Sequence, residues 1–110
     1  MRIWDVDPKI LCRNHLLGEH RELHALWTII TQNKKGYSSH PETKRWVGKL
    51  AALYDRHELL VLELNRRGYK HNSPLDKKLA IGERKQTVFI DSIENQKLIL
   101  KSKPCDCPFD

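Results

Sequence analysis

CRNHLLGEHRELHALW, the stretch from Cys12 to Trp27, predicts an amphipathic helix. At about 100° per residue, one side of this helix collects the apolar residues Cys12, Leu16, Leu23, Leu26, Trp27 and Ile30. His15, Glu19 and Glu22 follow one another at spacings of four and three, so they stack along one line inside the apolar arc. A merely amphipathic helix would turn such groups to solvent. We therefore expect desolvated, oriented groups of the kind that acid–base chemistry requires.

A structural interpretation of the same line stays open. Glu19 and Glu22 would then pair with arginines, and His15 would bond a backbone carbonyl. For any one of these residues that interpretation is the more common one. The three together, in a chain that begins Met1-Arg2, favour a functional site.

Composition indicates one domain with a single core, at 110 residues. The net charge is +6, and residues 28–57 alone carry +4, which suits a polyanionic partner such as nucleic acid. Solvated surface lysines would give the same charge. No apolar run reaches the length of about 20 residues that spans a bilayer, and the start lacks a signal-peptide pattern. We expect a cytoplasmic, nucleoid-associated, monomeric protein with reduced cysteines.

Capping signals set the expected bounds of the first helix. Asp7-Pro8 combines an N-cap residue with proline at the first helical position. The helix should then run from about Pro8 to Ile30 or Thr31, weakened at Gly18. Residues 32–39 are polar and basic and predict a loop.

A second long helix should begin at His40-Pro41-Glu42 and end at Arg66-Arg67-Gly68, where cations and a glycine are typical of a helix C-terminus. Both helices should exceed twenty residues and pack together. After Tyr69 we expect short helices and extended segments that cover the core. The predicted fold class is mostly α: a compact single-domain helical fold with two long packed helices and a short irregular C-terminal part.

Metal binding is not expected. Structural zinc sites pair ligands two to four residues apart, in two such pairs. Cys105 and Cys107 stand at the end of the chain, and Cys12 with His15 could complete a site only if that end docked there. His20 and His24 have a spacing of four but lie off the His15 line. We interpret these two histidines as a helix face or the wall of a substrate groove.

Residues 14–23, NHLLGEHREL, resemble the first helix of the phage-type endonuclease V family, the pyrimidine-dimer DNA glycosylases with AP-lyase activity. That family has an equivalent His-Leu-x-x-Glu-x-Arg-Glu-Leu. Met1-Arg2-Ile3 is similar to the family's start, and residues 66–69, RRGY, are similar to its Lys-Arg-Gly-Phe helix end. The resemblance covers about residues 1–70. Residues 75–110 diverge and lack the family's Trp/Tyr-rich C-terminal segment.

The resemblance implies a DNA repair enzyme that flips a damaged nucleotide and attacks its sugar with the chain's own α-amine. Met1 would supply the amine and Glu22 the catalytic carboxylate, without metal or organic cofactor. Residues that contact the DNA backbone or order the site would be Arg2, His15 and Arg21. We expect Glu19 and His20 to support the site. Where the family has a further arginine, this chain has Ala25.

An α-amine titrates near pH 7.7–8.0, so a useful fraction is neutral and can attack C1′ to give a Schiff base. A carboxylate is suited to stabilising the cationic intermediate and moving protons during β-elimination. Arg2 should keep Met1 in place. The expected substrate is damaged double-stranded DNA, with cyclobutane pyrimidine dimers favoured. Its phosphates would meet Lys34, Lys35, Lys44, Arg45 and Lys49, which position the duplex without reading sequence.

Two other functions remain open. A non-catalytic nucleic-acid-binding module would need the basic surface but not the free amine. A small helical interaction protein would use the His/Glu line as a buried polar network.

Overall fold

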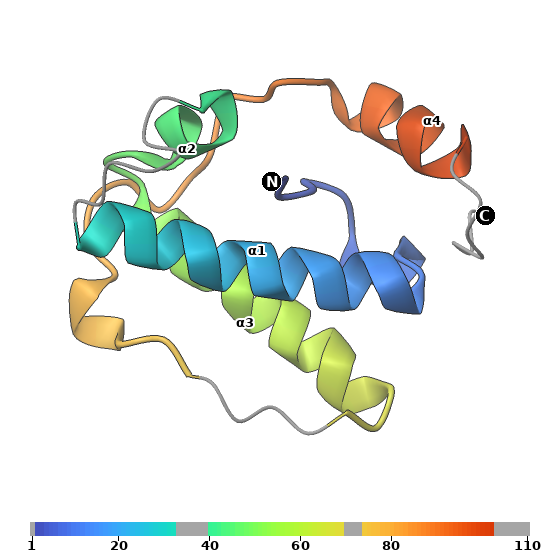
Figure 1. Cartoon of the computed structure of the whole chain (residues 1–110), viewed down its shortest axis with the longest axis horizontal. Coiled ribbons are helices and arrows are strands. Elements are labelled where there is room, and N and C mark those ends of the chain that lie inside the picture. The colour runs from blue at the N-terminus through green and yellow to red at the C-terminus, as the bar shows by residue number, and fades with distance from the viewer. Residues whose placement is uncertain (1, 33–39, 70–73, 103–110) are drawn as a thin grey trace.

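The computed structural model describes residues 2–32, 40–69 and 74–102, and in these ranges four α-helices surround one core (Figure 1). They are α1 (Arg13–Thr31), α2 (Pro41–Trp46), α3 (Leu50–Arg66) and α4 (Ile93–Ser102), with two short 3-10 helices, η1 (Pro8–Ile10) and η2 (Lys77–Leu79). The described residues form no strand, only one isolated antiparallel bridge between Lys49 and Gly82. The expectation of a mostly helical fold is confirmed.

The core lies where α1 packs against α3. Leu16, Leu23 and Leu26 of α1 are completely buried, as are Leu53 and Leu60 of α3. The N-terminal segment and α4 close the same core with the buried residues Ile3, Trp4, Val6 and Leu100. The apolar arc predicted on the first helix is therefore the face that the structure buries. No helix among the described residues is long and apolar enough to cross a membrane.

The first helix begins later than its capping signal predicts. Asp7 does cap a helix, with its carboxylate accepting from Lys9 N at 3.0 Å, but Pro8 opens only the single 3-10 turn of η1. Leu11 and Cys12 are then extended and buried, and α1 starts at Arg13. Burial of these two side chains outweighs the local signal. The helix consequently has 19 residues rather than more than twenty, and Gly18 lies within it without a break.

The predicted second helix is split in two. His40 Nδ1 accepts from Glu42 N at 3.1 Å and caps α2 as the sequence indicates. The chain then leaves the helix at Val47 and turns at Gly48, where φ is +77°, before the 17-residue α3 starts. The expectation of one helix longer than twenty residues is therefore wrong. Its predicted end is right, because α3 stops at Arg66 and Gly68 adopts a φ of +88°.

Residues 81–83 account for the break. Ala51 N donates to Ile81 O at 2.9 Å and Ala52 N donates to Glu83 O at 3.1 Å, so a distant segment satisfies N–H groups in the first turn of α3. Glu83 N donates back to Gly48 O at 2.9 Å. In a continuous helix, these N–H groups would donate to carbonyl oxygens of the preceding turn. Residues 81–83 would then lose their hydrogen bonds to α3. After it the chain crosses to α4 through an exposed stretch at residues 87–90.

Candidate active site

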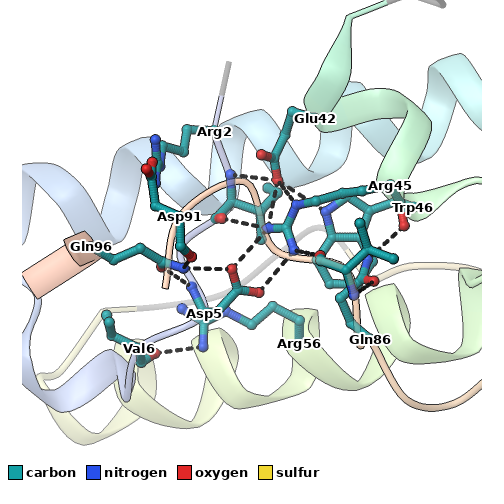
Figure 2. Close-up of polar contacts among 12 residues, drawn as sticks. Arg2, Asp5, Val6, Glu42, Arg45, Trp46, Arg56, Gln86, Asp91 and Gln96 are labelled. Atoms are coloured by element: carbon teal, nitrogen blue, oxygen red, sulfur yellow. Dashed lines mark hydrogen bonds and ion pairs between the residues drawn. The ribbon is translucent and has the colours of Figure 1, made fainter. Parts of the chain in front are cut away.

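The start of the chain is held by a buried arginine of α2. The Arg45 side chain is only 2% exposed, and its guanidinium donates to Glu42 Oε1 at 2.9 Å and to Asp5 Oδ1 at 3.1 Å. It also donates to the backbone oxygens of Ile3 at 2.8 Å and Val88 at 3.0 Å. Figure 2 shows this guanidinium at the centre of the network, between the N-terminal segment and α2.

Two further side chains fix the same segment. Glu42 Oε1 accepts from Ile3 N at 3.2 Å and from Trp46 Nε1 at 3.0 Å. Gln96 of α4 accepts from Asp5 N at 2.7 Å and donates to Asp5 Oδ2 at 2.9 Å. Residues 3–5 are thereby tied to α2 and α4, which bracket the N-terminal segment in Figure 1.

Arg2 stacks its guanidinium over the ring of Trp4, 4.5 Å from the ring centroid, and bonds Asp91 Oδ2 at 2.7 Å. Its Nε is buried and has no hydrogen-bond partner among the described residues. The side chain as a whole is 29% exposed. Arg2 is therefore held in one place by an aromatic ring and a carboxylate, and it keeps one donor unused.

Glu19, the middle residue of the predicted line, is completely buried. Its carboxylate forms a two-point ion pair with Arg56 of α3, at 2.7 Å and 3.0 Å, and accepts a bond from the backbone of Trp4. Arg56 also donates to Val6 O at 2.7 Å. Burial raises the pKa of the Glu19 carboxyl, and the Arg56 guanidinium opposes that rise. The pairing agrees with the structural interpretation of this residue.

Glu22 and His15 lie on either side of Glu19 along α1, and both are half-buried. The Glu22 carboxylate forms no hydrogen bond or ion pair with any residue that the structure describes. His15 makes an edge contact with Trp4, with ring centroids 6.0 Å apart, and its Nδ1 lies 3.1 Å from Cys12 Sγ. Of the two carboxylates on the line, Glu22 is the one not already neutralised by an arginine.

The expected phosphate contacts have different surroundings. Arg45 cannot serve as predicted, because its guanidinium is buried among internal acceptors; this expectation is corrected. Lys44 is exposed, as is Arg21 on α1. Lys49 Nζ donates to Gln86 Oε1 at 2.8 Å. Lys44 and Lys49 border an open pocket of about 400 Å³. Met1, Lys34, Lys35, Cys105 and Cys107 lie outside the described residues.

The residues that sequence reasoning missed are the anchors of the chain start. A local signal exists for three of them, because helical spacings of three and four separate Glu42, Arg45 and Trp46. This spacing does not predict that their side chains are buried. Asp5 and Gln96 are 91 positions apart, and no local pattern joins them. His57, which lies against His20 and His24, was not among the residues singled out from the sequence.

The family model described as pyrimidine dimer DNA glycosylase matches residues 1–77 of this chain. Searches of curated proteins and of solved structures found no match. The matched range contains the N-terminal segment and all of α1, α2 and α3, whereas Val88, Asp91 and Gln96 of the network lie beyond it.

Proposed function

Because this chain belongs to the pyrimidine dimer DNA glycosylase family, we propose that it excises damaged pyrimidines from duplex DNA and then cleaves the strand. Cyclobutane pyrimidine dimers are the favoured substrate. The nucleophile is the α-amine of Met1, and Glu22 is the catalytic carboxylate. The assignment is carried by the anchored start of the chain. Residues 3–5 are fixed to α2 and α4, and Trp4 contacts α1 at His15 and Glu19. Glu22 is three residues farther along α1 and has no partner among the described residues.

The chemistry is covalent. The neutral amine attacks C1′ of the damaged nucleotide, the C1′–N bond to the base breaks, and the base leaves with a proton. Opening of the sugar ring gives a protonated Schiff base between the amine and C1′. Loss of a C2′ proton then expels the 3′-phosphate by β-elimination, and water releases the enzyme from the sugar. An α-amine suits this role because its pKa of about 7.7–8.0 leaves part of it neutral at cellular pH.

The path of the N-terminal segment supports a role for Glu22. Trp4 meets α1 at His15 and Glu19, and Figure 1 shows the segment running back over α1 from η1. Going from Trp4 toward the chain start, each extended residue advances about 3.3 Å. Glu22 is only about 4.5 Å farther along α1 than Glu19. The described part of the segment therefore runs in the direction of Glu22, whose negative charge would stabilise the protonated Schiff base and whose carboxylate would accept the C2′ proton lost in β-elimination.

Residues around the start have suitable chemistry for DNA. The Arg2 side chain is 29% exposed and is held by Trp4 and Asp91, so the exposed part of its guanidinium could bond a phosphate or sugar oxygen. Arg21 and His15 lie on α1 next to Glu22 and Glu19, and Lys34, Lys35, Lys44 and Lys49 complete the proposed phosphate contacts. Glu19 supports the site by fixing Arg56 and Trp4. Extruding a nucleotide costs less where its pairing is damaged, which contributes to the choice of lesion.

The test is borohydride trapping on a duplex that contains an abasic site. The protein with a free α-amine should form a covalent adduct, and mass spectrometry should place the sugar on Met1. Acetylation of that amine should abolish trapping and base excision while circular dichroism stays unchanged. An adduct on a lysine, or full activity after acetylation, would refute the amine mechanism. DNA binding without any adduct would favour the non-catalytic binding module instead.

A further inference from the structure

Three histidines meet where α1 packs against α3. His20 and His24 stand one turn apart on α1, and His57 comes from α3. His24 Nε2 lies 3.2 Å from His20 Nε2 and 3.1 Å from His57 Nε2. One ligand atom from each of the three lies within 4.8 Å of the others. His57 is completely buried, and the other two rings are half-buried.

These distances match the ligand shell of a metal ion. Zinc binds imidazole nitrogen at about 2.0–2.1 Å, so two nitrogens of a tetrahedral site lie about 3.3 Å apart. Two of the three nitrogen pairs are already within about 0.2 Å of that separation. Histidines four residues apart on one helix are also a spacing that zinc sites use. The third pair, His20 and His57, lies within 4.8 Å and would have to shorten by at most about 1.5 Å to reach that separation.

The protonation of the rings supports the same conclusion. Each imidazole nitrogen offers either one proton or one lone pair in the ring plane. The two close contacts of His24 Nε2 therefore cannot both be full hydrogen bonds. A shared cation would accept one lone pair from each of the three rings at once.

A carboxylate beside the cluster orients its buried member. His57 Nδ1 lies 3.1 Å from Glu58 Oε1. When Nδ1 donates its proton to that oxygen, Nε2 holds the lone pair and faces His24. Carboxylate–histidine–metal arrangements of this kind are common around protein metal ions and raise the basicity of the ligand.

We propose that His20, His24 and His57 form a binding site for a divalent transition metal of the zinc class, with water in the fourth position. Imidazole ligands suit Zn²⁺, Cu²⁺ and Ni²⁺. The proposal replaces three expectations from the sequence: that no metal binds, that His20 supports the catalytic site, and that His20 and His24 form a helix face or the wall of a substrate groove. His20 and His24 are each two residues from Glu22, so they point about 160° away from it around α1. The metal would therefore link α1 to α3 and stabilise the fold, independently of the proposed amine chemistry.

The experiment titrates Zn²⁺ into chelator-treated protein. Elemental analysis should find one zinc per chain, and Co²⁺ in its place should give visible absorption of a tetrahedral site. Zinc at about a hundred times its Kd should raise Tm by roughly 10 °C. Binding should weaken as pH falls below about 6.5, because the histidines must be neutral to ligate.

Matched variants locate the site. His24→Gln and His20→Gln, made separately, should each weaken Zn²⁺ binding at least tenfold and remove the Tm shift. His40→Asn is the control, since asparagine keeps the cap of α2 and the residue is outside the cluster. It should bind as the wild type does. The proposal is overturned if the wild type binds no zinc at micromolar concentration, or if both cluster variants bind zinc like His40→Asn. Borohydride trapping by the wild type and by His24→Gln does not depend on this result, so the two proposals fail separately.

Discussion

Glu19 and Glu22 are neighbours on one face of α1 but occupy different surroundings. Glu19 is completely buried and paired at two points with Arg56. Glu22 is half-buried, and no residue in the described ranges pairs with it. A paired, buried carboxylate holds a structure together, whereas an unpaired one at the edge of the core can bind a developing positive charge. We therefore assign stability to Glu19 and chemistry to Glu22.

Glu22→Gln tests the chemical assignment. The variant keeps the shape of the side chain but removes its charge and its capacity to accept a proton. The rate of base excision should fall at least about a hundredfold. The free energy of unfolding, measured by urea denaturation, should change by less than about 0.5 kcal/mol. Binding to damaged duplex should persist in a gel-shift assay. Cleavage close to the wild-type rate would show that Glu22 is not the catalytic carboxylate.

Glu19→Gln should do the opposite. It leaves the Arg56 cation buried without its counter-ion, which typically costs about 3–5 kcal/mol. Urea denaturation should report this loss. The double variant Glu19→Gln/Arg56→Met should recover much of it, because no unpaired charge then remains in the core. Equal stability of Glu19→Gln and wild type would contradict the role of this ion pair.

At the level of elements, the junction between α2 and α3 depends on glycine. Gly48 and Gly82 both have positive φ, at +77° and +86°, and the segment around Gly82 accepts hydrogen bonds from the first turn of α3. A Cβ on Gly82 would lie 2.2 Å from the backbone oxygen of Gly48. That oxygen accepts from Glu83 N, so it cannot move away without loss of the contact.

Gly82→Ala should therefore destabilise the protein by about 1–3 kcal/mol, from backbone strain alone, and more from the clash. Gly18→Ala is the matched control. Gly18 lies inside α1, and an added Cβ there meets nothing within 4 Å. That variant should be stabilised by about 0.5–1 kcal/mol through helix propensity. Thermal denaturation of both proteins measures the contrast, and a Tm for Gly82→Ala at or above that of the wild type would contradict it.

Most elements whose deciding interaction is local were predicted from the sequence. The start of α1 is an exception, because Asp7-Pro8 caps only η1. The apolar arc of α1, the His40 cap of α2 and the Gly68 end of α3 involve residues within a few positions of one another, and all three are observed. The break at Gly48 was missed because its partners are residues 81–83. Helical periodicity cannot predict a contact between residues that are this far apart in the sequence.

The same limit applies to the candidate site. The line of His15, Glu19 and Glu22 was visible from helical spacing, and its burial at Glu19 is observed. The anchors of the chain start were not, because Asp5 and Arg45 meet only through the fold. Arg45 was expected at the surface, since an arginine in a basic stretch usually is.

At the scale of the whole molecule, the charge of +6 is distributed differently from the sequence expectation. Arg45 and Arg56 are internal and neutralised by Glu42, Asp5 and Glu19. Arg45 is therefore removed from the proposed phosphate contacts, which then depend on the lysines, Arg2 and Arg21. Lys44 belongs to α2, which lies above α1 at the upper left of Figure 1, whereas η2 lies below α1 at the left.

Salt dependence of DNA binding tests this distribution. Each phosphate contact contributes about 0.9 to the slope of log K against log salt concentration, because binding releases condensed counterions. Lys44→Gln/Lys49→Gln should lower the slope by roughly two and leave the preference for damaged DNA unchanged. The control, Lys77→Gln/Lys78→Gln, removes the same charge from the exposed η2. It should lower the slope much less, since these lysines would meet no phosphate. Equal slopes for the two variants would mean that Lys44 and Lys49 act only through net charge and do not contact the duplex.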